Sequence, residues 1–326
     1  MKDLENLNEI EKSFLLSEVA TLYYVHNMTQ SEIATRLFTS RSKISRLLKE
    51  SREKSIVEIK INEPCERNLE LEELLLKRFN LQYVRVLKNN NNSYEETLQK
   101  IGRLGAFHLE NTIDKNTILG VSWGRTIYNT INSLNCNKNI PITVVQVMGS
   151  ASKNNRQFDS LELTRRIAET YGGEYHYLTA PLFLDSLETK QILYKDPIIL
   201  DTLNLAKHAN MLLTGLGTID TESSNSIWKG YLNSYSKHNL IANGSIGHIC
   251  AHFIDSNGNR VNCDMNDKLV GIELEDLRKI ENVVCLTCGK QKSKVLLSAL
   301  KGGYINTLIT DDTAVFPFID ELKVTS

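Results

Sequence analysis

The chain of 326 residues is long enough for two domains, and its 41% hydrophobic and 24% charged residues are ordinary for a globular protein. A net charge of −1 gives no overall attraction for a polyanion, and the six cysteines are sparse, as expected of reduced thiols. No apolar run approaches the roughly 18 residues of a membrane span, and the N-terminus lacks the shape of a signal peptide, so we expect a cytoplasmic protein with no membrane partner.

Three short helices are the first elements that the sequence predicts. A stripe of apolar residues favours a helix over Phe14–His26. Thr29 and Glu32 have the spacing of a capping box, which predicts a second helix starting there. Ser40 is a suitable N-cap for a third helix that runs to about Ser51. Two short helices with a tight turn between them are typical of the helix-turn-helix.

The third helix has one apolar and one basic face. Ile44, Leu47 and Leu48 share the apolar face, and the segment from Arg36 to Lys54 holds seven Lys or Arg against two Glu. A basic face is often merely solvated, but here it coincides with a capped helix-turn-helix, which favours double-stranded operator DNA as a partner. The expected DNA-contacting residues are Ser40, Arg41, Ser42, Lys43, Ser45, Arg46 and Lys49.

The helical domain is expected to end near Asn62. The segment Ser55–Ile61 alternates and is rich in β-branched residues, which predicts a strand that closes the domain. Pro64 and its neighbours break that pattern. We therefore expect a DNA-binding domain at residues 1–62 and a second domain at residues 63–326.

Strands and helices alternate in the second domain, which predicts a doubly wound α/β fold. An apolar run at Ile118–Val121 reads as a strand that leads to a helix from Ile127. The other expected strands are Tyr83–Leu87, Ile142–Val147, Tyr175–Leu178, Met211–Thr214, Val283–Leu286 and Thr307–Thr310. The expected helices are Leu69–Phe79, Tyr94–Glu110, Leu161–Tyr171, Pro197–Ala209 and Gln291–Leu300. Gly247–Ile254 and Asn259–Val261, joined by Asp255–Gly258, are expected to form a hairpin.

The turn Ser122–Thr126 joins the strand at Ile118–Val121 to its helix and is a candidate anion site. A helix N-terminus directs backbone N–H groups and the positive end of its dipole at one spot, and Gly120 and Gly124 would allow close approach. Such turns also serve only to reverse the chain. Further turns rich in glycine or small residues follow other strands, however, and strand ends share one edge of a sheet. They are Met148–Ser152, Gly215–Ile219, Asn243–His248 and Cys288–Lys292, and together they predict a shared pocket for a small anion.

Several motifs in this order resemble the SorC family of sorbitol-operon regulators, and most of all its deoxyribonucleoside-regulator branch. They are the helix-turn-helix, Gly120–Thr126, Val144–Val147, Gly215–Thr218, Gly244–Ile249 and Leu308–Asp312. The resemblance extends from about Phe14 to the C-terminus. It implies a bacterial transcription regulator, expected to be a repressor, that assembles as dimers or tetramers. The large domain would be related to sugar-phosphate isomerases but would serve as a sensor.

The resemblance also implies an effector, a phosphorylated sugar, and no cofactor. The residues expected to bind this effector are Gly120, Ser122, Trp123, Gly124, Arg125, Thr126, Gln146, Gly149, Gly215, Gly217, Thr218, His248 and Lys292. Among them, Lys292 would match the lysine in the family's Gly-Gly-x-x-Lys turn. We expect it to approach the phosphate from the side opposite Gly120–Thr126.

Two positions depart from the family pattern. Met148 stands where the deoxyribonucleoside branch has a lysine suited to Schiff-base capture, and a thioether cannot form an imine. His248 stands where the family usually has an aspartate, and a neutral imidazole both donates and accepts. We therefore expect reversible, non-covalent binding of a different effector and no catalytic residues. The alternatives are an isomerase-like enzyme with an appended DNA-binding module, and a regulator that has lost its effector.

Two constellations have metal-like spacing, but neither is expected to hold a metal. Cys285 and Cys288 lack the second pair that a zinc site needs, so we interpret them as core thiols at the end of a strand. His248 and His252 are expected in one strand, where residues four apart are neighbours on the same face.

Overall fold

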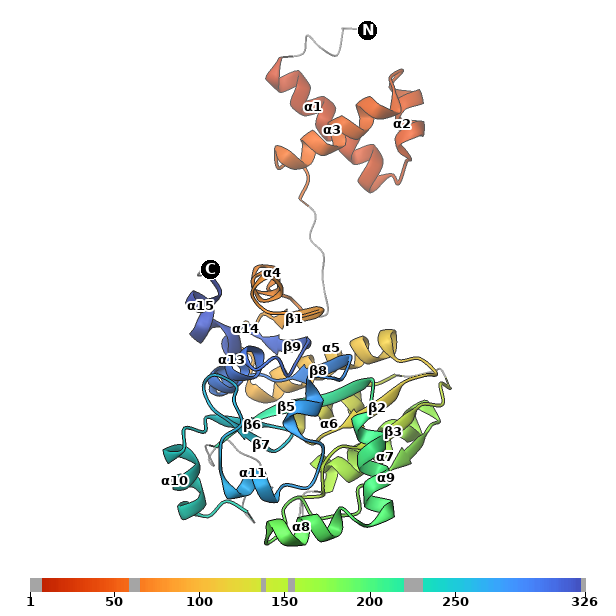
Figure 1. Ribbon diagram of the computed structural model, residues 1–326. Coiled ribbons are helices and arrows are strands. Elements are labelled where there is room, and N and C mark those ends of the chain that lie inside the picture. The colour runs from red at the N-terminus through yellow and green to blue at the C-terminus, as the bar shows by residue number, and fades with distance from the viewer. Residues whose placement is uncertain (1–7, 59–64, 136–138, 152–155, 220–230, 324–326) are drawn as a thin grey trace. The chain divides into compact units, whose positions relative to one another are not determined.

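The computed structural model describes residues 8–58, 65–135, 139–151, 156–219 and 231–323 (Figure 1). The chain divides into two compact units, Met1–Pro64 and Cys65–Ser326. The division falls two residues after the predicted domain boundary.

The N-terminal unit is a small helical domain, in which α1 (Glu9–Ala20) continues into a π-helical turn, η1 (Thr21–Val25). The helix-turn-helix consists of α2 (Gln30–Arg36) and α3 (Arg41–Glu53). Their caps are those that the sequence predicts: Thr29 and Glu32 form the capping box, and the Ser40 hydroxyl accepts a hydrogen bond from the backbone N–H of Lys43 at 3.2 Å. The core consists of buried side chains from all the helices, Leu16, Val19, Leu22, Ile33, Ala34, Ile44, Leu47 and Leu48.

The strand predicted over Ser55–Ile61 is wrong in the part that the structure describes. Residues 54–58 form turns and bends, whereas residues 59–61 lie outside the described part of the chain. The backbone N–H groups of Ile56 and Val57 donate to the Ser51 carbonyl and complete the end of α3. A strand forms only where another strand supplies hydrogen-bond partners, and the described residues of this unit contain none.

The second unit is built on a parallel sheet with the strand order β1-β9-β8-β5-β2-β3-β4. The strands are β1 (Tyr83–Leu87), β2 (Ile118–Val121), β3 (Thr143–Gln146), β4 (Glu174–His176), β5 (Met211–Thr218), β8 (Asn282–Leu286) and β9 (Thr307–Asp311). From the adjacent pair β2 and β5, the chain adds β3 and β4 on one side and β8 and β9 on the other. That pair is the topological switch point, beyond whose carboxyl ends α/β proteins bind their ligands.

Helices cover both faces of this sheet (Figure 1). The helices of the unit are α4 (Leu69–Arg78), α5 (Tyr94–Thr112), α6 (Arg125–Ser133), α7 (Ser160–Tyr171), α8 (Leu187–Leu193), α9 (Pro197–Lys207), α10 (Ser234–Ala242), α11 (Asp264–Lys268), α12 (Leu274–Leu277), α13 (Ser293–Lys301), α14 (Asp312–Val315) and α15 (Ile319–Lys323). Short 3-10 turns lie at η2 (Arg156–Phe158), η4 (Lys290–Lys292) and η5 (Phe316–Phe318). The strands are apolar on both faces and contribute side chains to two hydrophobic cores. One core includes side chains of α5, α6 and α7, and the other includes side chains of α4, α9 and α13. None of the described helices is long and apolar enough to cross a membrane.

The predicted hairpin forms as a short antiparallel bridge, in which Ile254 pairs with Arg260 and the backbone N–H of Val261 donates to the Phe253 carbonyl at 3.0 Å. A second hairpin, which the sequence does not predict, divides Gly247–Ile254 into two strands. Its strands are β6 (Gly247–Ile249), which pairs antiparallel with the end of β5, and β7 (His252–Ile254). The turn is Cys250–Ala251, with φ of 45° and 64°, whereas Asp255–Gly258 is the loop that follows β7. The sequence does not reveal this turn because two consecutive positive φ angles usually require Asn or Gly.

Candidate functional site

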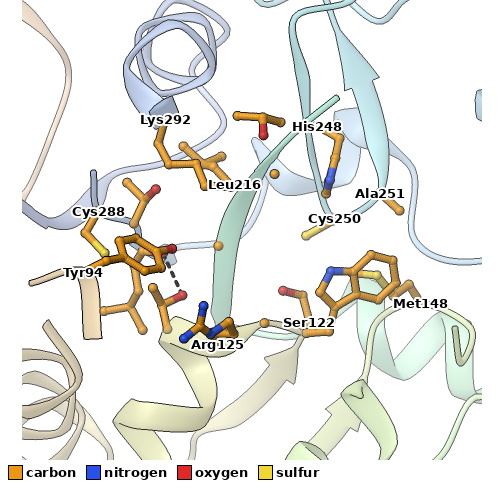
Figure 2. A pocket seen from close by; sticks show the side chains of 18 residues that line it. Tyr94, Ser122, Arg125, Met148, Leu216, His248, Cys250, Ala251, Cys288 and Lys292 are labelled. Atoms are coloured by element: carbon orange, nitrogen blue, oxygen red, sulfur yellow. Dashed lines mark hydrogen bonds between the residues drawn. The ribbon is translucent and has the colours of Figure 1, made fainter. Parts of the chain in front are cut away.

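A pocket opens at the carboxyl ends of β2, β5 and β8, at the switch point of the sheet (Figure 2). Its lining comes from the end of β5, from the turns after β2, β3 and β8, from the start of α5 and from the β6–β7 hairpin. The turn predicted at Gly215–Ile219 is wrong for Gly215–Thr218, which continue β5 because the end of β5 pairs with β6. The lining residues are Tyr94, Ser122, Trp123, Gly124, Arg125, Thr126, Met148, Gly215, Leu216, Gly217, Thr218, His248, Cys250, Ala251, Leu286, Thr287, Cys288 and Lys292. Ten of the thirteen residues predicted to bind the effector are therefore brought together.

The turn after β2 presents the start of a helix to the pocket. Gly124 is the N-cap of α6, and its φ of 138° is a conformation that side chains rarely adopt. No side chain of the described residues caps α6, which begins at Arg125, two residues before the predicted start. The first-turn N–H groups of a helix have no intrahelical acceptor, so this end of α6 is suited to an anion.

The two hydroxyls of this turn have structural partners. Ser122 Oγ donates to Thr214 Oγ1 at 3.2 Å, and Thr126 Oγ1 donates to the Leu286 carbonyl at 3.0 Å. These bonds join the ends of β2, β5 and β8. Both hydroxyl protons are already donated to acceptors within the protein. The donors that this turn can offer an anion are therefore its backbone N–H groups.

The turn after β8 supplies a lysine for which the described residues contain no acidic partner. Gly289, at a φ of 91°, begins the turn, and Lys292 ends it at the start of α13. Lys292 is partly buried, and burial lowers its pKa to about 8. No described carboxylate lies within ion-pair distance of its ammonium group. A protonated Lys292 is therefore an incompletely hydrated cation with no counter-ion in the described part of the chain, as an anion site requires.

Arg125, the other cation of the pocket, is already paired. Its guanidinium forms an ion pair with Glu95 in the first turn of α5 and lies 5.3 Å from the ring centroid of Tyr94. The Arg125 side chain is 32% exposed, and Glu95, at 65%, lies outside the pocket lining. The side chain of Arg125 thus lies against α5, at the pocket's edge.

Buried, largely apolar side chains form the opposite wall. Trp123 and Met148 are buried, and the ring of His248 packs so closely over Gly217 that a Cβ there would lie 1.8 Å from Nε2. Burial, with a smaller contribution from the charge of Lys292, lowers the pKa of His248 to about 3, so the imidazole is neutral. Cys250 Sγ lies 3.2 Å from Thr214 Oγ1, and burial raises the pKa of this thiol to about 12.

Three predicted site residues do not line the pocket. Gly120 lies inside β2, where a Cβ would stand 2.7 Å from a methyl group of Val147, and a Cβ on Gly149 would stand 2.3 Å from the Pro181 carbonyl oxygen. Both glycines serve close packing. Gln146 is fully buried, and its amide donates to the carbonyl of Met148 at 2.8 Å. It supports the apolar wall without facing the pocket.

Several lining residues escape sequence reasoning. Tyr94 reaches the pocket because it is the first residue of α5, beyond the polar Asn-rich loop. Cys250 and Ala251 reach it through the unforeseen hairpin turn. Cys288, by contrast, lines the pocket as the first residue of a turn that the sequence predicts there.

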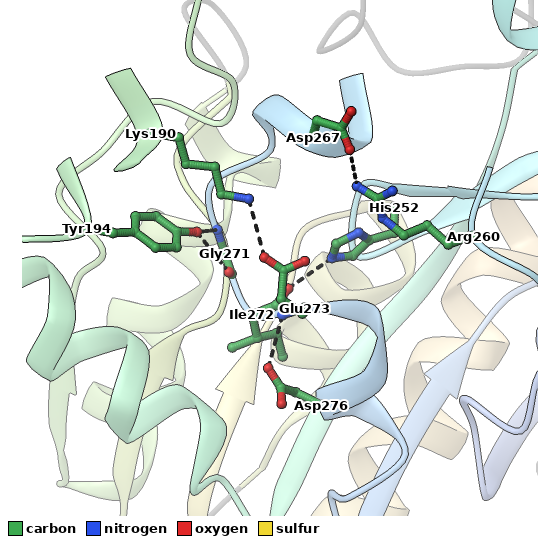
Figure 3. A network of polar contacts seen from close by, with 9 residues as sticks. All are labelled: Lys190, Tyr194, His252, Arg260, Asp267, Gly271, Ile272, Glu273 and Asp276. Carbon is green, nitrogen blue, oxygen red and sulfur yellow. Dashed lines mark hydrogen bonds and ion pairs between the residues drawn. The ribbon is translucent and has the colours of Figure 1, made fainter. Parts of the chain in front are cut away.

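Of the candidate metal ligands, His252 lies outside the pocket lining, in a network of polar contacts where its Nε2 is 2.9 Å from the Ile272 carbonyl oxygen (Figure 3). His248 and His252 lie on different strands, β6 and β7, because the chain turns at Cys250, so the single strand predicted for them is wrong. Cys285 and Cys288 are buried free thiols at the end of β8, as expected. Among the described residues, no group of three or more His, Cys, Asp or Glu could hold a metal ion.

The basic face predicted for the N-terminal unit is a feature of α3. Ile44, Leu47 and Leu48 are buried beneath it, as predicted, and so is Ser51. The opposite face is exposed and contains Arg41, Ser42, Ser45, Arg46 and Lys49, whereas Lys43 is partly buried and Ser40 is the N-cap. Lys49 pairs with Glu53 at 3.6 Å, and Arg46 has no ion pair within the described part of the chain.

Comparisons with known proteins agree with this architecture. The family model described as "Putative sugar-binding domain" matches residues 63–316. The chain is 31% identical over 313 residues to the deoxyribonucleoside regulator of Bacillus subtilis, covering 96% of this chain and 99% of the relative. It is 30% identical over 310 residues to the sorbitol operon regulator of Klebsiella pneumoniae, covering 94% and 97%. The crystal structure of full-length SorC from K. pneumoniae superposes with a TM-score of 0.71 at 30% identity, covering 94% of this chain and 98% of SorC.

A sugar-binding α/β unit joined to a helix-turn-helix defines a transcriptional regulator rather than an enzyme. The chain belongs to the SorC family of transcriptional regulators.

Proposed function

We propose that the protein is an operator-binding repressor that a phosphorylated sugar releases from DNA, with no cofactor. The observation that carries this proposal is the convergence of two anion-binding features on one pocket. The start of α6 and Lys292 both line it, at the switch point of the sheet, and the described residues supply neither a side-chain cap for α6 nor an acidic partner for Lys292. A phosphate monoester satisfies both, because it offers acceptor oxygens and a double negative charge.

The apolar wall supports an effector that differs from those of the family branch and is bound without a covalent bond. Met148 cannot form an imine. The neutral His248 can donate a hydrogen bond to a hydroxyl or carbonyl oxygen, or accept one from a hydroxyl group. We expect borohydride treatment with aldehyde sugar phosphates to leave the protein mass unchanged. A trapped adduct would contradict this, and the Lys292→Met variant would show whether Lys292 is the amine responsible.

The sign of regulation and the assembly are part of the proposal. Operators of helix-turn-helix proteins are commonly palindromic because dimers read two half-sites. We therefore propose that the protein binds DNA as a dimer or tetramer. Mass photometry of the protein alone and with a duplex selected from a random-sequence library tests this. A single copy on the selected duplex would contradict it.

A thermal-shift screen is the direct test of the effector site. It compares inorganic phosphate, pentose 5-phosphates, hexose 6-phosphates and hexitol phosphates with the same sugars lacking phosphate. A ligand at 100 times its dissociation constant adds about 2.7 kcal/mol to the free energy of unfolding. We expect shifts only from phosphorylated compounds, and the best of them should release the selected duplex. Equal shifts from the unphosphorylated sugars would contradict the anion site.

A further inference from the structure

A chain of hydrogen bonds runs from the pocket toward the start of the sugar-binding unit. Asp311, at the end of β9, is fully buried and accepts two of these bonds. Its Oδ1 accepts from the backbone N–H of Gly289 at 2.8 Å, and its Oδ2 accepts from the side-chain amide of Asn89 at 3.1 Å. Gly289 begins the turn that ends at Lys292. One buried carboxylate therefore joins the cationic turn of the pocket to Asn89.

Asn89 also connects to the other side of the pocket. Its carbonyl accepts from the backbone N–H of Asn92 at 2.8 Å, and the next residue, Ser93, caps α5. Tyr94, the first residue of α5, lines the pocket beneath the guanidinium of Arg125. Both cation-bearing turns thus reach Asn89, one through Asp311 and the other through the start of α5.

The neighbours of Asn89 hold the point where the chain enters this unit. Lys88 Nζ and Asn90 Nδ2 donate to the two carboxylate oxygens of Glu66, each at 2.8 Å. The backbone N–H of Lys88 donates to the Glu66 carbonyl at 2.8 Å, and that of Asn68 donates to Val86 at 2.7 Å. The unit begins at Cys65, so Glu66 is its second residue. The residues before it lead to the helix-turn-helix.

We propose that Asn89 relays occupancy of the pocket to the Glu66–Asn68 segment, through its hydrogen bond to Asp311. This inference rests on the proposed anion site. When an anion binds Lys292, the turn from Gly289 to Lys292 is held in one position, and Asp311 imposes that position on Asn89. A buried carboxylate is costly to leave without its donors, so the bonds of Asp311 to Gly289 and Asn89 persist together with a third, which the Thr313 hydroxyl donates to Oδ2. A ligand acts on DNA binding only by favouring one of two states, and this link lets the pocket favour one arrangement of Glu66–Asn68.

Amide hydrogen exchange tests the relay without knowledge of the effector or operator. The probe is inorganic phosphate, and the reporters are the backbone amides of Asn68 and Lys88, which join the Glu66–Asn68 segment to Val86 in β1 and to the residue that follows β1. In the wild-type protein, phosphate should slow exchange at both amides, because a more stable local structure opens less often. Asn89→Ala should still bind phosphate with wild-type affinity but should lose this slowing, since Asn89 lies outside the pocket lining.

An exchange of donor and acceptor separates the relay from general loosening of the loop. Asp311→Asn leaves a carbonyl for Gly289 but turns an amide toward the amide of Asn89, so the slowing should disappear. The double variant Asn89→Asp/Asp311→Asn restores the bond in reverse, and the slowing should return. Asn91→Asp is the matched control, because Asn91 is exposed in the same loop, and it should behave as wild type.

The outcomes separate this inference from the proposed function. If phosphate gives no thermal shift in the wild-type protein, the proposed anion site is wrong. If phosphate binds but does not change exchange at Asn68 and Lys88, or if the change persists in Asn89→Ala, the relay is wrong. Should Asn89→Ala fail to fold, the double variant decides: binding of phosphate without slowed exchange would overturn the relay.

Discussion

The turns after β2 and β8 have the same construction but treat their cations differently. Each turn follows a parallel strand, contains a glycine at positive φ, Gly124 or Gly289, and starts a helix. The turn after β2 carries Arg125, whose charge is paired with Glu95. The turn after β8 carries Lys292, which has no such partner in the described structure and whose pKa burial lowers to about 8.

The difference indicates where an anion gains its binding energy. An anion that binds Arg125 competes with a carboxylate already present, and the net gain is small. An anion that binds Lys292 supplies the counter-ion that an incompletely hydrated ammonium group lacks. The turn after β2 therefore contributes mainly the backbone N–H groups of α6, and the turn after β8 contributes the charge.

Replacing Lys292 is expected to have the largest effect. Lys292→Met should weaken binding of the best sugar phosphate by about 2–5 kcal/mol, as truncation of one partner of a desolvated ion pair does. The same variant should be more stable than wild type without ligand, by roughly 1 kcal/mol, because a poorly solvated cation is removed. Thermal melting with and without ligand measures both effects. In the cell, the variant should repress without responding to effector.

A neighbouring lysine provides the control for this prediction. Lys290 lies in the same turn but is exposed and outside the pocket lining, so Lys290→Met should change neither quantity appreciably. Equal losses of affinity in the two variants would mean that the turn contributes only general positive potential.

The contrast between paired and unpaired cations recurs on α3. Arg46→Ala should weaken DNA binding by about 1–3 kcal/mol and relax selectivity at one base position of each half-site, as loss of a base-reading arginine does. Lys49 is paired with Glu53, so Lys49→Ala should cost less and should act alike on all sequences. Fluorescence anisotropy with the selected duplex and a scrambled one, across a salt series, distinguishes the two. Wild-type affinity and selectivity in Arg46→Ala would contradict the role of the α3 face.

Alkaline pH should reproduce part of the Lys292→Met effect. Without ligand, Lys292 loses its proton near pH 8, and an anion must then restore it, so affinity should fall about tenfold per pH unit above 8. Below about pH 6 the affinity should also fall, because a phosphate monoester becomes a monoanion. Lys292→Arg should lack the alkaline decline, since guanidinium stays charged. An unchanged decline in that variant would assign the titration to another group.

The stability of the ligand-free protein should respond to pH in the opposite direction. The pKa of Lys292 is lower in the folded protein than in the unfolded chain, so between about pH 8 and the ordinary lysine value the unfolded chain binds more protons. Wild-type stability should therefore rise with pH across that window, compared with Lys292→Met. Chemical denaturation of the two proteins at several pH values measures this difference.

Much of the fold was predictable because its signals are local. The capping box at Thr29 and the N-cap at Ser40 mark helix starts, and both are where they were predicted. Continuous apolar runs predicted the buried parallel strands, and glycine turns after them predicted the pocket edge. The parts that failed depend on distant partners. The segment after Ser55 has strand composition but no neighbouring strand among the described residues. The hairpin turn at Cys250 lacks the residues usual in such a turn, and it forms because β6 pairs with both β5 and β7.

The charges of the site were less predictable than its backbone. Lys292 and Arg125 are both basic residues in glycine turns, and nothing nearby in the sequence distinguishes them. The partner of Arg125 is 30 residues away, at the start of α5, and its position follows only from the folded sheet. Gln146 and Gly149 are residues of the kinds that often line binding sites, yet here both serve the packing of the protein interior. Backbone signals thus predicted the site's place, whereas pairing of charges required the structure.

Removing the partner of Arg125 is the smallest of the expected effects and the closest test of the comparison. Glu95→Gln keeps the size of the side chain and removes its charge. Because Glu95 is 65% exposed, its pair with Arg125 contributes less than about 1 kcal/mol, and the melting temperature should hardly change. The freed positive charge should tighten binding of the sugar phosphate by less than about 1 kcal/mol, and this gain should vanish at high salt. Isothermal titration at two ionic strengths measures both. If Glu95→Gln instead weakens binding, the carboxylate positions Arg125 for the phosphate. In that case Arg125 and Lys292 both supply positive charge to the phosphate, and the turn after β8 is not its main source.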